Sequence, residues 1–325
     1  GSLVIAQHGK GLKNFLEKKG NYVEIISSEN TFTIPIKKVK NPSFMISSFF
    51  KSKFKKNFDI VHAQNPISAV AMKNISGKKI LSLQGNYSKQ ILLLHGQTAG
   101  SISKKLEKNA LNWADKITVP SKEMYQEYVK NGYTVSYVPN AIDISSFSHD
   151  EDRRYQKQLI YAGRLSEEKG ILDLLDFLQL LSNDIDILIL GSGPEESKVR
   201  EKAKLFSNVH FLGYQSKENT IKLIRGSDII VQPSLMEGGT SSTLLEAMAC
   251  KTPIIATSVD GNKETIIQMQ TAYVVSPKQP LEILDAIIDL LGSSEKQKIL
   301  SDNAFKLVSN YDWKNIGQKY LEAYG

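Results

Sequence analysis

The sequence predicts an α/β protein with two doubly wound domains, each built on a parallel sheet. Short β-branched runs alternate with amphipathic helical stretches along nearly the whole chain, which is the pattern of repeated β-α-β units. Most of these runs are continuously apolar, as expected for strands that helices cover on both faces. A polar run without a strand candidate, residues 142–158, separates two halves, and 325 residues suffice for two domains.

The first half is predicted to form one domain over residues 1–150. Its five strand candidates are residues 22–27 (YVEIIS), 58–64, 78–85, 116–121 and 135–140. The helical stretches expected between them include residues 101–114 and 121–131.

The second half is predicted to form another domain over residues 151–310, followed by a terminal amphipathic helix over residues 311–325. Its six strand candidates are residues 158–163, 186–193, 208–213, 228–234, 252–257 and 272–275. The helices expected between them are residues 170–182, 194–206, 216–226 and 280–291. Because doubly wound sheets bind ligands beyond the carboxyl ends of their strands, two such domains facing each other would hold a site in a central cleft.

Composition excludes several classes of protein. The chain is 41% hydrophobic and 23% charged, as in ordinary globular domains. A single cysteine, Cys250, cannot form a disulfide framework, so we expect a reducing compartment. No apolar run approaches the roughly 18 residues of a membrane span, and no secretory signal is visible. We therefore expect a cytoplasmic protein.

Positive charge is concentrated in the first half. Residues 1–150 carry 21 Lys and Arg against 10 Asp and Glu, whereas residues 151–325 carry 20 against 24. An anionic membrane surface or an anionic substrate is the natural partner of such a basic half. In one segment apolar residues and lysines are interleaved: Phe44, Ile46, Phe49, Phe50 and Phe54 with Lys51, Lys53, Lys55 and Lys56. It predicts either an amphipathic helix on an anionic membrane or a surface helix with a solvated basic rim. No recognised module supports nucleic-acid binding.

Two strand-to-helix junctions, AGRLSEEKG (162–170) and GSGPEE (191–196), are marked by glycine. Glycines permit close backbone approach, and a helix N-terminus offers N–H groups to an anion. For GSGPEE the favoured interpretation is a tight turn. In the first junction Arg164 and Lys169 suit an anionic diphosphate. The alternative is that they form a solvated loop with the neighbouring glutamates.

A third junction, SLMEGGTSSTLLEAMA from Ser234, places Glu237 and Glu246 on either side of small residues. Ser241 or Ser242 fits the N-cap of the following helix. The small residues leave room for a ligand, and a carboxylate can accept two hydrogen bonds from a vicinal diol. Complementarity to the helix dipole explains Glu246 equally well, but it does not explain the run of small residues.

An ordered set of segments resembles the retaining glycosyltransferases of family 4, which have the two-domain GT-B fold. The segments are VPNAIDISSF, AGRLSEEKG, LGSGPE, NVHFLGY and PSLMEGGTSSTLLEAMACKTPIIATSVDGNKETI. The likeness spans most of the chain, is strongest over residues 115–325, and includes a last helix that crosses back onto the first domain. It implies transfer of a sugar from a nucleotide-diphosphate sugar to a glycan or lipid-linked acceptor. It also implies a role in polysaccharide biosynthesis. Together with the basic first half, it leads us to expect a peripheral location at the inner membrane face.

The resemblance also implies roles for individual residues. Those assigned to the reacting centre are Arg164 and Lys169, which would hold the diphosphate, and Glu237, near the donor sugar. Those assigned to the donor nucleotide and sugar are Gly239, Thr240, Ser241, Glu246 on the ribose, and Gly213 and Tyr214 at the base. Those assigned to the acceptor side are Gln84 and His62, although a structural role for His62 is at least as well supported.

No metal and no cofactor are expected, and the donor is expected to be UDP-linked. One Asp-x-Asp triplet, residues 184–186, opens an apolar strand and is interpreted as a turn. Arg164 and Lys169 can replace a metal in stabilising the leaving diphosphate.

The sequence departs from the family pattern in three places. Glu237 and Glu246 are nine residues apart, whereas the family usually spaces its two glutamates by eight. Gln84 stands where the family often has a histidine, and an amide can bond a hydroxyl but cannot carry a proton. Residues 1–20 fit either a short strand, loop and helix, or a helix from the start with Gly1 closing a glycine loop whose preceding strand is absent. The second is favoured, because apolar residues there share one helical face.

Two other functions remain open. Gln84 and the shifted Glu237 also suit a catalytically silent sugar-nucleotide-binding protein. The fold also suits a sugar-nucleotide epimerase, although the ordered family-4 segments argue against it.

Overall fold

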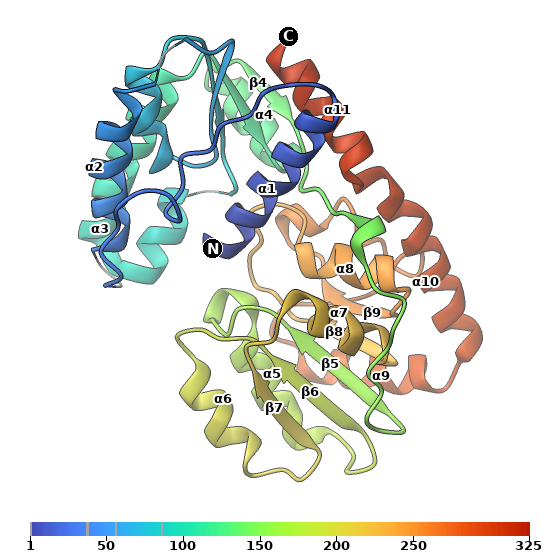
Figure 1. The fold of residues 1–325 in the computed structure, drawn as a ribbon. Coiled ribbons are helices and arrows are strands. Elements are labelled where there is room, and N and C mark those ends of the chain that lie inside the picture. Colours follow the sequence, from blue (N-terminus) through green and yellow to red (C-terminus); the bar gives the residue numbers. More distant parts are fainter. Residues whose placement is uncertain (1, 37–38, 56, 86) are drawn as a thin grey trace. The chain divides into compact units, whose positions relative to one another are not determined.

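The computed structural model describes residues 2–36, 39–55, 57–85 and 87–325. The chain divides into two compact units (Figure 1). Unit 1 comprises residues 1–141 and 313–325, and unit 2 comprises Ile142–Asp312. Residues 142–150, placed in the first domain on sequence grounds, belong to unit 2. The reason is local pairing, since the Ile142 N–H donates to the Tyr311 carbonyl at 2.9 Å.

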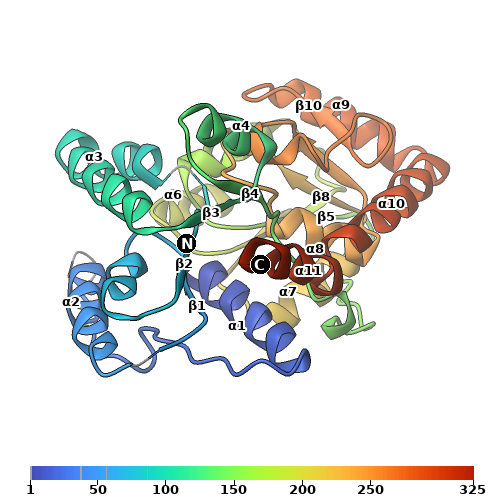
Figure 2. The ribbon, with the colours of Figure 1, turned by 90° about the horizontal axis from the view of Figure 1, so that it is seen from above.

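Unit 1 contains a four-stranded parallel sheet in the order β1-β2-β3-β4. The strands are Ile60–Ala63, Lys78–Ser82, Lys116–Val119 and Val135–Tyr137. Its helices are α1 (Ser2–Lys18), α2 (Lys40–Ser52), η1 (Ser68–Asn74), α3 (Tyr87–Trp113, broken at Gly96), α4 (Lys122–Lys130) and α11 (Trp313–Tyr324). In Figure 2, α1 and α11 lie side by side. Leu12, Ile316 and Tyr320 of these helices pack together in one buried cluster.

Two expectations for the start of the chain have different outcomes. The helical interpretation is confirmed by α1, in which His8 and Leu12 are buried. The strand prediction for residues 22–27 is wrong, because this segment joins no sheet ladder and leaves Tyr22 81% exposed. β-propensity yields a strand only where a partner edge is in reach, and no described strand pairs with these residues.

Unit 2 contains a six-stranded parallel sheet in the order β10-β9-β8-β5-β6-β7. In chain order the strands are β5 (Gln158–Ala162), β6 (Asp186–Leu190), β7 (Val209–Gly213), β8 (Ile229–Gln232), β9 (Ile254–Thr257) and β10 (Tyr273–Val275). The main helices are α5 (Ile171–Phe177), α6 (Glu196–Ala203), α7 (Lys217–Arg225), α8 (Ser242–Cys250), α9 (Pro280–Leu291) and α10 (Ser294–Val308). These elements confirm the six strands expected in the second half.

The unit 2 sheet is buried on both faces, which explains its continuously apolar strands. Along β5, Leu159 and Tyr161 belong to one hydrophobic cluster, whereas Ile160 and Ala162 belong to another. The first cluster includes residues of α5 and α9, and the second includes residues of α7, α8 and α10.

The strand order of unit 2 reverses at β5. From β5 the chain adds β6 and β7 on one side, then returns to add β8, β9 and β10 on the other. The loops that follow β5 and β8 therefore leave the same edge of the sheet beside each other. Such a topological switch point is where doubly wound sheets bind ligands.

None of the helices in the described part of the chain is long and apolar enough to cross a membrane.

Candidate functional site

Backbone packing brings together the loops that follow β5 and β8 in unit 2. Gly170 has φ +66°, and a Cβ on it would lie 1.8 Å from the Pro233 carbonyl oxygen. The backbone N–H groups of Leu235 and Met236 both donate to the Glu168 carbonyl, at 3.0 and 3.2 Å. Residues 163–170 and 233–241 therefore form one joined surface at the switch point.

Lys169 and Glu237 meet on this surface. Lys169 Nζ lies 2.5 Å from Glu237 Oε2, and the Ser234 hydroxyl donates to Glu237 Oε1 at 2.8 Å. Glu237 is buried, so these two partners replace the water that its carboxylate loses. Although Glu237 lies nine residues before Glu246 and not eight, its carboxylate still contacts Lys169. Arg164 lies on the same loop, half-exposed and 3.6 Å from Glu168.

The run Gly238–Ser241 leads into α8. Ser241 is the N-cap, but its side chain makes no capping hydrogen bond. Its N–H donates to Asn262 Oδ1 at 3.2 Å, and the Thr240 hydroxyl donates to the Gly261 carbonyl at 3.2 Å. The Ser241 N–H is thus already used within the protein and is not available to a ligand. The N–H groups of the first turn of α8 lack intrahelical acceptors and remain suited to an anion.

Glu246 lies on α8, is only 7% exposed, and pairs with Lys217. Lys217 begins α7, and its Nζ lies 5.3 Å from the centre of the Phe147 ring. Sequence reasoning missed Lys217. A lysine at the start of an amphipathic helix normally faces solvent, and nothing local indicates a partner 29 residues away.

The two glycines that follow β6 serve close packing, whereas Gly213 at the end of β7 serves a left-handed turn. A Cβ on Gly191 would lie 1.8 Å from the Gly163 carbonyl oxygen, and one on Gly193 2.2 Å from that of Leu165. These contacts support the tight-turn interpretation of GSGPEE. Gly213 has φ +65°, its carbonyl accepts from the Gly191 N–H, and Tyr214 beside it is 63% exposed.

No group of three metal-ligating side chains occurs among the described residues. Asp184 lies 2.5 Å from Lys157, and Asp186 lies 2.7 Å from His210. Both aspartates lie at the amino end of β6, away from the loops at the carboxyl ends.

His62 and Gln84 lie in unit 1. His62 Nδ1 is 2.8 Å from the Tyr324 hydroxyl, and Nε2 is 2.7 Å from Ser82 Oγ. Burial lowers the pKa of His62 to about 3, so the ring is neutral near pH 7. With both nitrogens engaged, His62 fits the structural alternative. Gln84 is half-buried, two residues beyond the end of β2.

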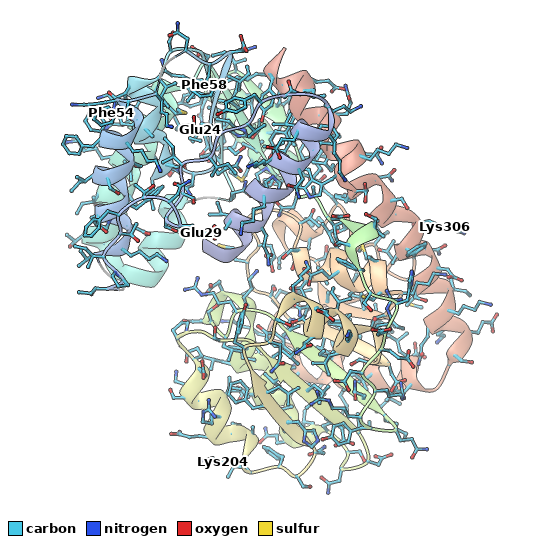
Figure 3. The ribbon with its side chains drawn as sticks, viewed as in Figure 1. Glu24, Glu29, Phe54, Phe58, Lys204 and Lys306 are labelled. Atoms are coloured by element: carbon cyan, nitrogen blue, oxygen red, sulfur yellow. The ribbon has the colours of Figure 1, made fainter. Side chains whose placement is uncertain are left out.

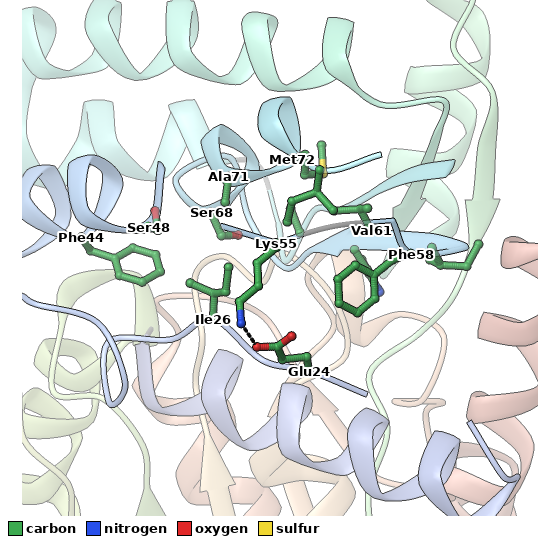
Figure 4. Close-up of a pocket in the computed structure, with 14 residues that line it drawn as sticks. Glu24, Ile26, Phe44, Ser48, Lys55, Phe58, Val61, Ser68, Ala71 and Met72 are labelled. Atoms are coloured by element: carbon green, nitrogen blue, oxygen red, sulfur yellow. Dashed lines mark hydrogen bonds and ion pairs between the residues drawn. The ribbon is translucent and has the colours of Figure 1, made fainter. Parts of the chain in front are cut away.

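A separate cavity of about 120 Å³ lies within unit 1 (Figure 4). It is lined mainly by apolar side chains from α2, η1 and β1, with the ion pair of Lys55 and Glu24 beside it. His62 contributes to its wall, but none of the predicted donor-binding residues does.

Comparison with known protein families shows to which family the chain belongs. Residues 142–307 match the family described as Glycosyl transferases group 1, and residues 4–146 match Glycosyltransferase Family 4. The chain belongs to the group 1 glycosyltransferases. This confirms the resemblance seen in the ordered segments of the sequence.

Two relatives show how far this group 1 glycosyltransferase has diverged. An uncharacterised glycosyltransferase of Methanocaldococcus jannaschii is 24% identical over 290 residues, covering 85% of this chain and 70% of its own length. The phosphatidyl-myo-inositol mannosyltransferase of Mycobacterium leprae is 22% identical over 281 residues, covering 82% and 73%.

Solved structures share the GT-B fold with this glycosyltransferase. HepE of Anabaena, in complex with UDP and glucose, matches with a TM-score of 0.72 at 18% identity, covering 95% of this chain and 88% of that one. The sucrose-phosphate synthase of Thermosynechococcus elongatus matches with 0.71 at 19% identity, covering 88% and 77%. At such identities the likeness shows the fold alone.

Proposed function

We propose that this glycosyltransferase moves a sugar, with retention of configuration, from a UDP-linked donor to a glycan or lipid-linked acceptor in polysaccharide biosynthesis. The observation that carries the proposal is the buried contact of Lys169 with Glu237 at the switch point of unit 2, with Arg164 on the same loop. It combines a diphosphate-binding cation with a carboxylate suited to sugar hydroxyls. The UDP and glucose named for HepE support the choice of donor.

In the proposed reaction the anomeric C–O bond breaks and the diphosphate leaves with the bonding electrons. Lys169, Arg164 and the first turn of α8 would stabilise the negative charge that develops on it. The acceptor hydroxyl attacks from the face that the diphosphate leaves, and its proton passes to the leaving phosphate. No metal or cofactor takes part in this proposal.

Two ion pairs must open when the donor binds. The diphosphate would draw Lys169 from Glu237, which frees the carboxylate for the sugar. The ribose hydroxyls would likewise replace Lys217 on Glu246. Because each charge already has a partner, the empty site avoids leaving a buried charge unpaired.

Incubation with UDP-, GDP- and ADP-glucose separates the candidate functions. A transferase releases the nucleoside diphosphate and forms an α-linked product or, with water as acceptor, free sugar. Gln84 is the residue that favours the silent binding protein, which would bind a donor without releasing diphosphate. An epimerase would interconvert the sugar of the intact donor. Either of the last two results contradicts the proposal.

The Glu237→Gln variant tests the catalytic role of the shifted glutamate. The amide keeps a hydrogen bond to Ser234 but removes the charge that holds Lys169. We expect turnover to fall by about 10²-fold, because a charge near the reacting centre is lost, while UDP binding is not weakened. Unchanged turnover, measured by UDP release, would assign Glu237 a structural role.

We further propose that unit 1 lies on an anionic membrane surface at the cytoplasmic face. Large apolar side chains on α2 and next to it are exposed, and Lys53 Nζ lies 5.2 Å from the centre of the Phe50 ring; the exposed residues are Phe32, Ile36, Ile46, Phe50 and Phe54. Phe54 is 85% exposed and lies at the outer side of unit 1 (Figure 3). Aromatic side chains beside lysines suit the boundary between lipid headgroups and acyl chains.

Sedimentation with vesicles tests the membrane proposal. We expect binding to vesicles that contain phosphatidylglycerol and little binding to pure phosphatidylcholine, since each lysine near an anionic surface contributes about 1 kcal/mol. The Phe50→Ser, Phe54→Ser double variant should lose binding. Leu205→Ser, which removes a 72% exposed apolar side chain from unit 2, should not. Equal binding by all three proteins would contradict the proposal.

A further inference from the structure

The loop that follows β9 holds the glycine-rich run that leads into α8. The Gly261 N–H lies 3.5 Å from the Glu237 carbonyl oxygen, and the Gly261 carbonyl accepts from the Thr240 hydroxyl at 3.2 Å. Asn262 Oδ1 accepts from the Ser241 N–H at 3.2 Å. Three contacts therefore span the length of this run, from the glutamate to the N-cap.

The two loops also touch through their backbones. A Cβ built on Gly261 would lie 2.2 Å from the carbonyl carbon of Gly239. No side chain larger than hydrogen fits at Gly261 without moving one loop from the other. The separation of the loops is thus set by direct backbone contact.

Asn262 is itself firmly held. It is 0% exposed, its N–H donates to the Val259 carbonyl at 2.8 Å, and its carbonyl accepts from Thr265 and Ile266 at 2.9 and 2.8 Å. Its Nδ2 is buried without a hydrogen-bond partner among the described residues. An unmet amide donor is unfavourable in a protein interior, so the contribution of this side chain must lie in its oxygen, on the Ser241 N–H.

We infer that Asn262 is a positioning residue that fixes residues 237–241 and, through them, the Glu237 carboxylate and the N-terminus of α8. The inference rests on the proposed function, because it assigns residues 237–241 to donor binding. Asn262 acts through the Ser241 N–H. Because the Ser241 N–H is already bonded, the donor diphosphate would bind the N–H groups of the next three residues instead. A loop fixed before binding loses less conformational entropy when the donor arrives.

The Asn262→Ala variant tests the inference first without any ligand. We expect amide hydrogen exchange at residues 238–241 to speed up at least about tenfold, because local opening becomes easier. Asn262→Asp retains an oxygen acceptor and should retain the protection. If Asn262→Ala does not fold, Thr240→Val, which removes the hydrogen bond to Gly261, should give the same acceleration.

The matched control is Asn208→Ala. Asn208 is also buried, with its Nδ2 bonded to the Ser182 and Ile185 carbonyls and its Oδ1 without a partner among the described residues. It lies at the start of β7, so its loss should destabilise unit 2 without changing exchange at residues 238–241. Unchanged exchange in Asn262→Ala, or equal acceleration in Asn208→Ala, overturns the inference.

Calorimetric titration with UDP tests the consequence for the donor. We expect Asn262→Ala to raise the Kd for UDP about tenfold through lost preorganisation, and Asn208→Ala to leave it near the wild-type value. Faster exchange with an unchanged Kd also overturns the inference. If the wild type binds none of UDP, GDP and ADP, the proposed function fails instead, and hydrogen exchange alone then decides whether Asn262 fixes the loop.

Discussion

At the scale of single residues, the proposed donor site in unit 2 consists of charges that are matched to one another. Glu237 is paired with Lys169 and bonded by Ser234, and Glu246 is paired with Lys217. Removing the lysine from either pair leaves a buried carboxylate without its counter-charge, because Glu237 and Glu246 are each only 7% exposed. Substitutions here therefore affect both stability and binding, and controls must separate the two effects.

Lys169→Ala is expected to weaken UDP binding by roughly 10- to 100-fold, because it removes a charge-assisted contact worth about 1.5–3 kcal/mol. Uridine, which lacks the diphosphate, should bind almost as it does to the wild type. Isothermal titration with both ligands measures the difference. Lys157→Ala, which breaks another 2.5 Å ion pair at the amino end of the sheet, should change neither affinity. An equal loss for UDP and uridine would show that Lys169 does not contact the diphosphate.

At the scale of elements, the site depends on how closely the loops after β5 and β8 approach each other. Gly170 is the contact point, with a left-handed backbone and the Pro233 carbonyl directly over it. Neither the sheet nor the helices fix this distance alone. A side chain at residue 170 would push the cation-bearing loop from the loop that carries Glu237.

Gly170→Ala should therefore lower the stability of unit 2 by about 3 kcal/mol or more and weaken UDP binding by at least about tenfold. Gly132→Ala separates strain from packing, because Gly132 has φ +82° but open space around its Cα. An alanine in this left-handed conformation should lower the free energy of unfolding by only about 1–2 kcal/mol. UDP binding should stay unchanged. Urea unfolding and calorimetry measure both effects. Similar results for the two variants would refute the packing role of Gly170.

At the scale of the whole molecule, a buried polar network joins the two ends of the chain within unit 1. His8 of α1 bonds the Tyr320 hydroxyl at 2.8 Å, and His62 of β1 bonds Tyr324 at 2.8 Å. Tyr320 and Tyr324 both lie on α11, more than 250 residues further along the chain than either histidine. The last helix thus completes the core of the first unit.

This network makes the stability of unit 1 depend on pH. Burial lowers the pKa of His8 to about 4 and that of His62 to about 3, below the unfolded value near 6.5. Below about pH 6.5 the two histidines therefore become protonated in the unfolded chain but stay neutral in the folded unit. The stability of unit 1 falls as the pH falls. As the pH falls from about 7.5 to 5.5, the two histidines together should lower the free energy of unfolding of unit 1 by about 3 kcal/mol.

Urea unfolding followed by tryptophan fluorescence measures this loss, because Trp113 and Trp313, the two tryptophans of the chain, both lie in unit 1. The His8→Gln, His62→Gln double variant should lose most of the pH dependence. His149→Gln, which changes an exposed histidine of unit 2, should retain it. A pH slope that persists in the double variant would place its origin elsewhere.

Local sequence predicted much of this molecule. The apolar strands of unit 2, the helical character of residues 2–18 and the loops bearing Arg164, Lys169 and Glu237 all follow from patterns within about ten residues. Residues 22–27 show the limit, since they have the composition of a strand but no described partner edge. Lys217 shows it again, because its partner Glu246 lies on another helix.

The sequence by itself determined the two α/β units, the family, and which loops carry cations, carboxylates and small residues. Only the tertiary structure decided how these loops meet: Gly170 against Pro233, Lys169 on Glu237, and Asn262 on the Ser241 N–H. The physical reason is the distance along the chain over which each kind of interaction acts. Periodicity and turn chemistry act between neighbours in the chain, whereas the order of strands in a sheet brings together residues that are 21 to 68 positions apart.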